Sequence, residues 1–460
     1  MDISYAMAEK ISRIRFDDLP TPVIEKTKLL ILDTIGVAMA GSSAPGCKEV
    51  VDQITACGGK RESSILVYGP KVPAFLAAFV NSMMAHARDF DETHDKALTH
   101  ALVSVLPTAL AVAEQSKKTT GAEFITAIVL GTDVVCRLGL AFQPQEAKGR
   151  SFSGWHFSAI NGFFGSAATA AKLMKFDQTR LHNTLGIVYS QVAGSRQPRA
   201  DGALTKRMQP ALAAKGGIFS AFLAASGITG AKNIFEGDYG FFKLYREPSV
   251  PYDANELTDE FGQRFEILNI SVKPYPCARP THAAIRPTID LVKREDIAAK
   301  NVQQVTVSVP HKSFESVGKP FEIRTNAQVD AQFSIPYTVA VAIARRDVTL
   351  ADFETEAVQN PEILKLARKV DVVIDPEAEG WTPVEIEITL KGGQSHSTKE
   401  TVLRGDPENP MNKEEITNKF RKCCEFAAKP LSKDRLDKGL ETVENLERIE
   451  NVSDLATFFC

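Results

Sequence analysis

Three histidines and several carboxylates lie within fifteen residues, between His86 and His100, in a chain that has only eight histidines. A histidine beside a carboxylate can act as a general base whose ring the carboxylate orients. The same residue types can also hold a metal ion. The segment, HARDFDETHDKALTH, contains neither an HExxH nor an HxxxH pair, so we expect no metal site. A polar helix end capped by Asp and Thr would have a similar composition.

A further histidine, His156, follows Gly154-Trp155 and precedes a run of small residues. It could lie at the N-terminus of the helix which that run predicts, where anions are favoured. Gly162 and Gly165 resemble part of a dinucleotide fingerprint, but no strand precedes them and the third glycine is missing. The alternative is a structural histidine beside closely packed helices.

Four cations fall within twelve residues of a loop that contains Gly and Pro: Arg196, Arg199, Lys206 and Arg207. Guanidinium and ammonium groups are what a polycarboxylate or a phosphate requires. A basic loop that faces solvent would have the same composition, so both interpretations remain open.

The segment KPYPCARPTH, from Lys273 to His282, has three prolines that fix an extended and rigid backbone. It lies where helical periodicity gives way to strand periodicity, and domain junctions are common ligand sites. Its Lys, Cys, Arg and His side chains could line such a site. Cys277 as a nucleophile is one alternative, and a rigid linker facing water is another.

The four segments together favour one kind of chemistry. They supply imidazole and cationic groups with Asp89 as a carboxylate, and no nucleotide loop, serine elbow or metal signature. Imidazole groups can move a proton next to a substrate carboxylate while cations stabilise the enolate charge that develops. The sequence therefore predicts an anionic substrate.

The elements that must position these segments change in type along the chain. Residues 1–267 show helical periodicity, alanine-rich stretches and a capping box at Thr120–Glu123. Residues 268–404 carry alternating apolar runs that predict strands. Helical periodicity returns over 405–460. We predict a mainly α protein in which a large all-helical domain, from both chain ends, holds an inserted, smaller α+β domain.

Within the inserted domain, Val305–Val309 and Val384–Leu390 are the predicted strands. Helices are predicted over 329–345 and 349–369. Pro336 is expected to kink the first of these helices or to mark its true start.

Composition excludes several classes of protein. The 460 residues are 44% hydrophobic and 24% charged, with a net charge of −3, so no basic excess suggests a nucleic-acid partner. Seven cysteines without a CxxC pair favour a reducing compartment. The first residues lack a secretory signal pattern, and the apolar run 124–142 carries Asp133 and Arg137, which favours a buried helix over a membrane span. We expect a cytoplasmic protein with no membrane partner.

The sequence resembles the MmgE/PrpD family, which includes 2-methylcitrate dehydratase, cis-aconitate decarboxylase and iminodisuccinate epimerase. The matching segments span nearly the whole chain in order: HARDFDETH, GWHFSAINGFFGSAATAAKL, TKRMQPALAAKGG, GITGAKNIFEGDYGF, KPYPCARPTH and GDPENPM. The resemblance implies a helical domain with an inserted α+β lid domain, a homodimer, and no metal or organic cofactor.

The resemblance also implies where the site lies. The catalytic candidates are His156, His100, Asp89, Lys206 and Lys273. The substrate-binding candidates are Thr93, Arg207 and His282, and the residue types of the KPYPCARPTH segment add Cys277. His156 or His100 would exchange the substrate proton, the cations would bind carboxylates, and Asp89 would orient a histidine or a cation.

Three positions depart from the family pattern. Ala101 follows His100, at a position where proline is common in the family. Gln209 replaces a histidine that is usual there. Cys277 lies a few residues after Lys273, in the place where decarboxylases of the family carry a histidine. We therefore expect dehydration of a citrate-like polycarboxylate such as 2-methylcitrate. The alternatives are an epimerase of an iminodisuccinate-like dicarboxylate, a cis-aconitate-type decarboxylase, and a non-catalytic anion-binding protein.

Overall fold

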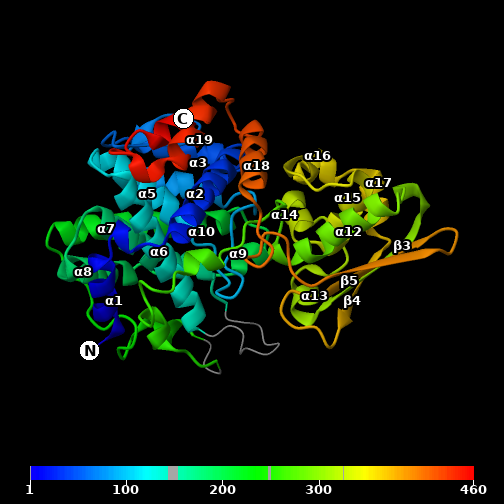
Figure 1. Cartoon of the computed structure of the whole chain (residues 1–460), viewed down its shortest axis with the longest axis horizontal. Helices are drawn as coiled ribbons and strands as arrows, with labels where there is room; N and C mark the ends of the chain where they lie inside the picture. The colour runs from blue at the N-terminus through cyan, green and yellow to red at the C-terminus, as the bar shows by residue number, and fades with distance from the viewer. Residues whose placement is uncertain (1, 143–153, 247–249, 325) are drawn as a thin grey trace.

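The computed structural model describes residues 2–142, 154–246, 250–324 and 326–460. A larger helical unit and a smaller α+β unit lie side by side (Figure 1). The helical unit contains α1 (Ile3–Arg13), α2 (Thr21–Gly41), α3 (Cys47–Cys57), α4 (Ala74–Ala85), α5 (Leu102–Ser116), α6 (Gly121–Ala141), α7 (Phe157–Leu173), α8 (Gln178–Tyr189), α9 (Gln197–Ala200), α10 (Thr205–Ala225), α11 (Phe241–Tyr245), α18 (Lys413–Glu425) and α19 (Lys433–Glu444). The protein is mainly α, as predicted.

Small residues let the central helices of this unit approach closely. A Cβ added to Gly165 of α7 would lie 2.8 Å from the carbonyl oxygen of Gly131 in α6. One added to Gly217 of α10 would lie 2.6 Å from the backbone nitrogen of Ala167 in α7. The alanine- and glycine-rich stretches thus serve close helix packing, and this packing fixes the start of α7, where His156 lies.

Helix α6 is the one helix in the described part of the chain that is long and apolar enough to cross a membrane. It is buried almost entirely within the helical unit. Asp133 pairs with Arg137 at 3.2 Å inside it, and Arg137 also donates to the carbonyl oxygens of Glu256, Asp259 and Arg264. These internal partners explain how two charged residues are accommodated in a core helix.

The α+β unit is built on a four-stranded sheet of order β4-β3-β5-β6. Its strands are β3 (Val302–Pro310), β4 (Val370–Asp375), β5 (Val384–Leu390) and β6 (Ser395–Glu400). Strand β3 pairs parallel with β4 and antiparallel with β5. Its helices are α12 (His282–Arg294), α13 (His311–Val317), α14 (Ala327–Gln332), α15 (Ile335–Arg345), α16 (Thr355–Val358) and α17 (Pro361–Ala367). Alternate residues of β3 and β5 are buried, which confirms both predicted strands.

Each unit has its own hydrophobic core. The larger core draws on residues 7–272 and 416–459, and the smaller on residues 275–403. The chain crosses between them where Val272 donates its N–H to the carbonyl oxygen of Gly405. The limits 1–267, 268–404 and 405–460 remain predictions.

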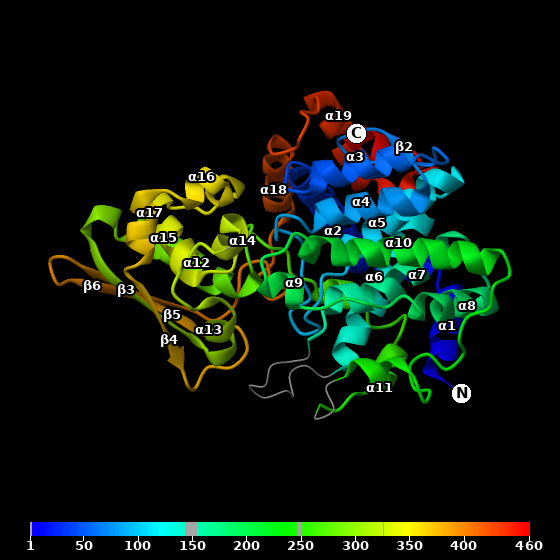
Figure 2. The same cartoon turned by 180° about the vertical axis from the view of Figure 1, so that it is seen from behind.

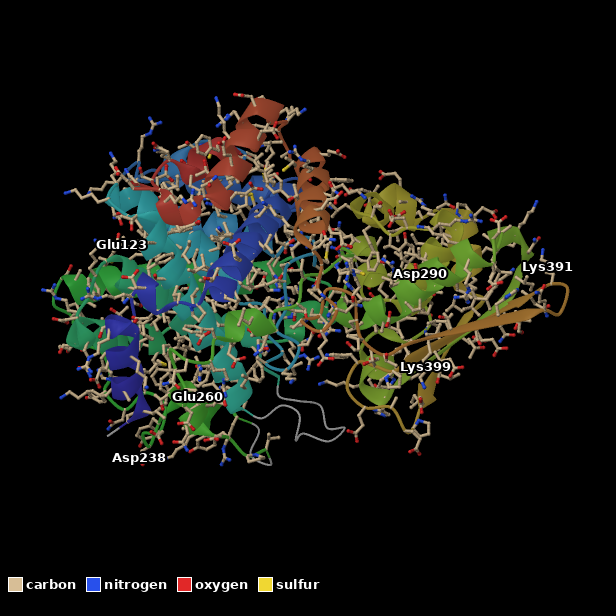
Figure 3. All side chains as sticks on the ribbon, in the orientation of Figure 1. Glu123, Asp238, Glu260, Asp290, Lys391 and Lys399 are labelled. Carbon is tan, nitrogen blue, oxygen red and sulfur yellow. The ribbon has the colours of Figure 1, made fainter. Side chains whose placement is uncertain are left out.

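Charged side chains such as Asp238 and Glu260 on one unit and Lys391 on the other point outward (Figure 3).

Three details differ from the sequence-based predictions. The helical unit is not entirely helical, because β1 (Ser63–Ser64) and β2 (Lys71–Val72) form a short antiparallel pair. The helix predicted over 329–345 is divided at Phe333 and Ser334, and Pro336 lies in the first turn of α15, where its missing N–H costs nothing. The helix predicted over 349–369 is divided into three short pieces, the last beginning at Pro361.

Candidate active site

Asp89 lies at the centre of a cluster of side chains from three distant parts of the chain. It belongs to the loop that follows α4, which here is called the 86–95 loop. Its carboxylate Oδ2 accepts a hydrogen bond from Lys206 Nζ of α10 at 2.8 Å. Lys273 Nζ donates to the backbone oxygen of Asp89 at 3.0 Å and lies 3.9 Å from Oδ1. The convergence predicted for these three residues is therefore present.

The backbone and the charges both hold Asp89 in this place. Its φ angle is +51°, in the left-handed region that non-glycine residues seldom adopt. Burial opposes ionisation, but the Lys206 and Lys273 ammonium groups outweigh it and hold the pKa of the Asp89 carboxyl below its usual range. Asp89 is thus an anion that keeps two cations in fixed positions.

A second buried carboxylate, Asp91, joins two histidines. Its Oδ2 lies 2.8 Å from Nδ1 of His86 and 3.0 Å from Nδ1 of His100. His100 Nδ1 also lies within hydrogen-bond distance of the backbone oxygen of Glu92. If Nδ1 carries the proton in both rings, each ring presents an unprotonated Nε2. Nε2 of His86 is buried without a hydrogen-bond partner in the described structure.

His156 completes a group of three imidazoles. It is the N-cap residue of α7, as its place in the sequence indicated. Its ring centroid lies 5.7 Å from that of His86, with an angle of 29° between the planes, and the His86 ring lies 5.3 Å from His100. Burial, the neighbouring imidazoles and Lys206 lower the pKa of His156 well below its ordinary value. The ring is therefore neutral near pH 7.

A small pocket opens beside this cluster at the boundary between the two units. Figure 2 shows α9 next to α14 at this boundary. The pocket walls are His86, Ala87, Asp89, Pro198, Arg199, Ala203, Lys206, Arg207, Val329 and Phe333. The free space inside is about 10 Å³, enough for a single water molecule. Both units contribute to the walls, since Val329 and Phe333 belong to the α+β unit.

Three of the predicted substrate-binding residues do not reach the pocket walls. Thr93 forms a backbone bridge with Ser271, and its hydroxyl points toward the backbone oxygen of Thr99. His282 is buried edge-on against Tyr275 and bonds to the backbone oxygen of Cys277. Cys277 is not part of the walls either, and the same is true of His100, His156 and Lys273, so the roles assigned to these residues remain predictions. The fourth residue, Arg207, does line the pocket and donates to the backbone oxygen of Pro45 at 2.9 Å.

Cys277 is a poor nucleophile in this structure. Its Sγ lies 3.0 Å from the hydroxyl of Thr281, and burial raises the pKa of the thiol to about 12. We expect Cys277→Ala to keep at least half of the wild-type activity. Iodoacetamide should modify the exposed Cys57 and leave Cys277 unmodified, as peptide mass spectrometry of the folded protein would show. Activity lost in parallel with alkylation of Cys277 would contradict this.

Residues that the sequence analysis did not select hold the 86–95 loop in place. Lys419 of α18 pairs with the buried Asp33 at 2.7 Å and donates to the backbone oxygen of Phe90 at 2.8 Å. Gln332 of the α+β unit donates to the backbone oxygens of Arg88 and Pro276 at 2.7 and 3.0 Å. No local motif marks these residues. His86, Asp91 and Arg199 were visible within the motifs, but Phe333 was not.

The buried His86 predicts a specific response to acid. Burial, with Lys206, lowers the pKa of His86 from 6.5 to about 4 although Asp91 opposes this. Between these two values the unfolded chain binds a proton that the folded protein does not, so stability is lost as the pH falls from 6.5 toward 4. The expected loss from this residue at pH 5 is about 2 kcal/mol. Urea unfolding of wild type and His86→Gln at pH 7 and pH 5 measures it; equal losses in the two proteins would refute the assignment.

Within the described ranges, no group of three His, Cys, Asp or Glu side chains has an arrangement that could hold a metal ion. The donors that surround Asp89 are ammonium groups, which repel cations. The arrangement is instead suited to an anion that bears carboxylates, with neutral imidazoles beside it.

Comparison with known proteins identifies a family and several similar proteins. Residues 5–251 match the model of the MmgE/PrpD N-terminal domain, and residues 275–446 match that of the MmgE/PrpD C-terminal domain. The cis-aconitate decarboxylase of Aspergillus terreus is 27% identical, over 96% of this chain and 93% of that protein. The cis-aconitate decarboxylases of Mus musculus and Homo sapiens are 29% and 27% identical, over 98% and 99% of this chain and 92% and 94% of those proteins.

Proposed function

Because the chain belongs to the MmgE/PrpD family, we propose that it is a lyase that decarboxylates an unsaturated tricarboxylate of the cis-aconitate type. The single observation that carries the proposal is the pairing of Lys206 and Lys273 on Asp89 beside three imidazoles. The similar proteins are decarboxylases, which favours this reaction over the dehydration preferred from sequence.

One of the three positions that favoured dehydration, Cys277, has less weight in the folded protein. Cys277 lies in the place where decarboxylases of the family carry a histidine. Its side chain is buried against Thr281 and is not part of the pocket wall. A change at this position therefore need not alter what touches the substrate. Dehydration and epimerisation remain alternatives because each begins with proton movement on a carbon next to a carboxylate.

The charge of the pocket supports an anionic substrate. Lys206, Arg207 and Arg199 line it, whereas Asp89 is the one carboxylate among its wall residues and is already paired. Lys273 adds a further ammonium group behind Asp89. A tricarboxylate would supply the negative charge that these groups lack, and charged hydrogen bonds of this kind are strong.

The proposed reaction breaks one carbon–carbon bond. The carboxylate on the carbon next to the double bond leaves as CO2, and its electron pair forms a new double bond. The original double bond shifts, and its far carbon takes up a proton. We propose that the carboxylates of the bound substrate raise the pKa of His156, so that its ring, whose buried Nδ1 has no hydrogen-bond partner in the described structure, takes up a proton from water and delivers it to this carbon. Lys206 and its neighbours stabilise the charge that builds up on the remaining carboxylates.

The α+β unit is proposed to act as a lid. The pocket has free space of about 10 Å³, so a tricarboxylate cannot enter while Phe333 and Val329 remain where they are. Movement of the α+β unit, or of these side chains, would make room. The resemblance further implies that no metal or organic cofactor takes part, and this also remains a prediction.

The experiment that tests the function uses the purified protein in D2O with cis-aconitate, 2-methylcitrate and iminodisuccinate. We expect CO2 release from cis-aconitate with one deuterium on the product carbon. Formation of a new double bond from 2-methylcitrate without CO2 would instead establish a dehydratase, and exchange with inversion of iminodisuccinate would establish an epimerase. Tight binding of all three without any reaction would indicate an anion-binding protein.

We also propose that the protein is a homodimer in the cytoplasm. Leu212 and Phe219 of α10 and Ile228 after it are 43%, 42% and 52% exposed, and Phe219 contacts Phe75 of α4. Figure 2 shows α10 along one surface of the helical unit. Apolar surface of this kind is often covered by a second subunit. Light scattering should give twice the chain mass for wild type and a smaller mass for Phe219→Asp; a monomeric wild type would refute the dimer.

A further inference from the structure

Arg199, like Arg207, is a pocket cation that forms no ion pair with a carboxylate among the described residues. Lys206 is paired with the Asp89 carboxylate, and Arg207 donates to a backbone oxygen at 2.9 Å. Arg199 donates to the Ser316 hydroxyl at 2.9 Å and, more weakly, to the Ser316 backbone oxygen at 3.4 Å. In the described residues no carboxylate forms an ion pair with it. Arg196 repels its charge, and Asp89 attracts it more weakly.

An aromatic ring occupies the place where a counterion of Arg199 would lie. The guanidinium carbon of Arg199 lies 4.5 Å from the centroid of the Phe333 ring, and Lys206 Nζ lies 5.8 Å from the same centroid. The face of an aromatic ring attracts cations, but a carboxylate attracts them more strongly. Phe333 therefore acts as a weak substitute for an anion between two cations.

The backbone next to Phe333 is held firmly by its neighbour. Gln332 bonds through its side chain to the backbone oxygens of Arg88 and Pro276, and its own backbone oxygen accepts the N–H of Ala278. These bonds would hold the segment in place while the Phe333 side chain rotates out of the pocket. Space vacated by the ring would lie between Arg199 and Lys206.

We propose that Arg199 determines specificity for tricarboxylates by binding one substrate carboxylate in the space that the Phe333 ring fills. The inference rests on the proposed function, because it identifies the part of the proposed substrate pocket that distinguishes a tricarboxylate from a dicarboxylate. Lys206 shares this carboxylate from the opposite side. Ser316 of the α+β unit keeps the guanidinium aimed into the pocket, so both units take part in recognition.

The experiment measures binding by calorimetry with two saturated ligands that cannot react, tricarballylate and glutarate. They differ by one carboxylate, so their affinity ratio isolates its recognition. We expect wild type to prefer tricarballylate and Arg199→Gln to weaken tricarballylate binding by about 10- to 100-fold with less than a threefold effect on glutarate. Arg180→Gln, an exposed residue of α8, removes the same charge and should change neither affinity. Equal weakening of both ligands, or no weakening, would overturn the proposal.

A second variant tests displacement of the ring. Phe333→Ala should bind tricarballylate three- to tenfold more tightly, since no ring has to leave; unchanged or weaker binding would overturn this step. Both measurements are independent of turnover. If wild type fails to decarboxylate cis-aconitate but still loses its tricarboxylate preference in Arg199→Gln, the proposed reaction fails and the assignment of Arg199 survives. If turnover is seen and KM for cis-aconitate is unaffected by Arg199→Gln, the assignment of Arg199 fails alone.

Discussion

Replacing His156 by alanine is expected to lower kcat for cis-aconitate by about 100- to 10,000-fold, the usual contribution of a positioned acid or base. The ring lies next to His86, at the start of α7, and its buried Nδ1 has no partner in the described structure. Carboxylates of a bound substrate would raise the pKa of this imidazole, and the protonated ring could then transfer a proton to carbon. Steady-state kinetics, with circular dichroism to establish folding, measures the effect.

A matched control variant distinguishes the loss of proton transfer from the general effect of removing a histidine. His396 lies on β6 in the α+β unit, away from the pocket, so His396→Ala should keep nearly full activity. In His156→Ala, KM should change far less than kcat, because the cations that bind carboxylates remain. Full retained activity in a folded His156→Ala protein would remove His156 from the mechanism.

Replacing Lys419 by methionine is expected to destabilise the protein by about 3–5 kcal/mol at neutral pH, the range for breaking a buried ion pair. Lys419 is 6% exposed and Asp33 is 1% exposed, so the partner that remains is cut off from water. The backbone oxygen of Phe90, in the 86–95 loop, also loses its donor. Activity should fall as well, because Asp89 and Asp91 flank Phe90.

The loss of stability in Lys419→Met should depend on pH in a defined direction. Burial already raises the pKa of Asp33 although Lys419 opposes it, and removing Lys419 takes away that opposition. A carboxyl whose folded pKa is raised costs stability as the pH rises, so the deficit should be larger at pH 8 than at pH 5. Urea unfolding of Lys419→Met, of Lys419→Met with Asp33→Asn, and of the exposed control Lys422→Met measures it. A deficit that is independent of pH and not reduced in the double variant would refute the pair's role.

Local sequence signals determined the elements of this protein and indicated its chemistry. Thr120 and Glu123 form the capping box at the start of α6 because such a box depends on residues three apart. Strands β3 and β5 follow from alternation along the strand itself. The residue types around Asp89, His156, Lys206 and Lys273 indicated an anionic substrate and proton transfer, since charge and titration belong to the side chain.

Tertiary structure decided which side chains share the site. Asp91 joins His86 to His100, and Lys419 supports the 86–95 loop from more than three hundred residues away. Cys277 and His282 lie in the same motif as Lys273, yet rotation of the chain after Lys273 buries them against Thr281 and Tyr275. The free energy of such contacts depends on which segments, distant along the chain, are buried against each other, and one-dimensional spacing does not contain that information.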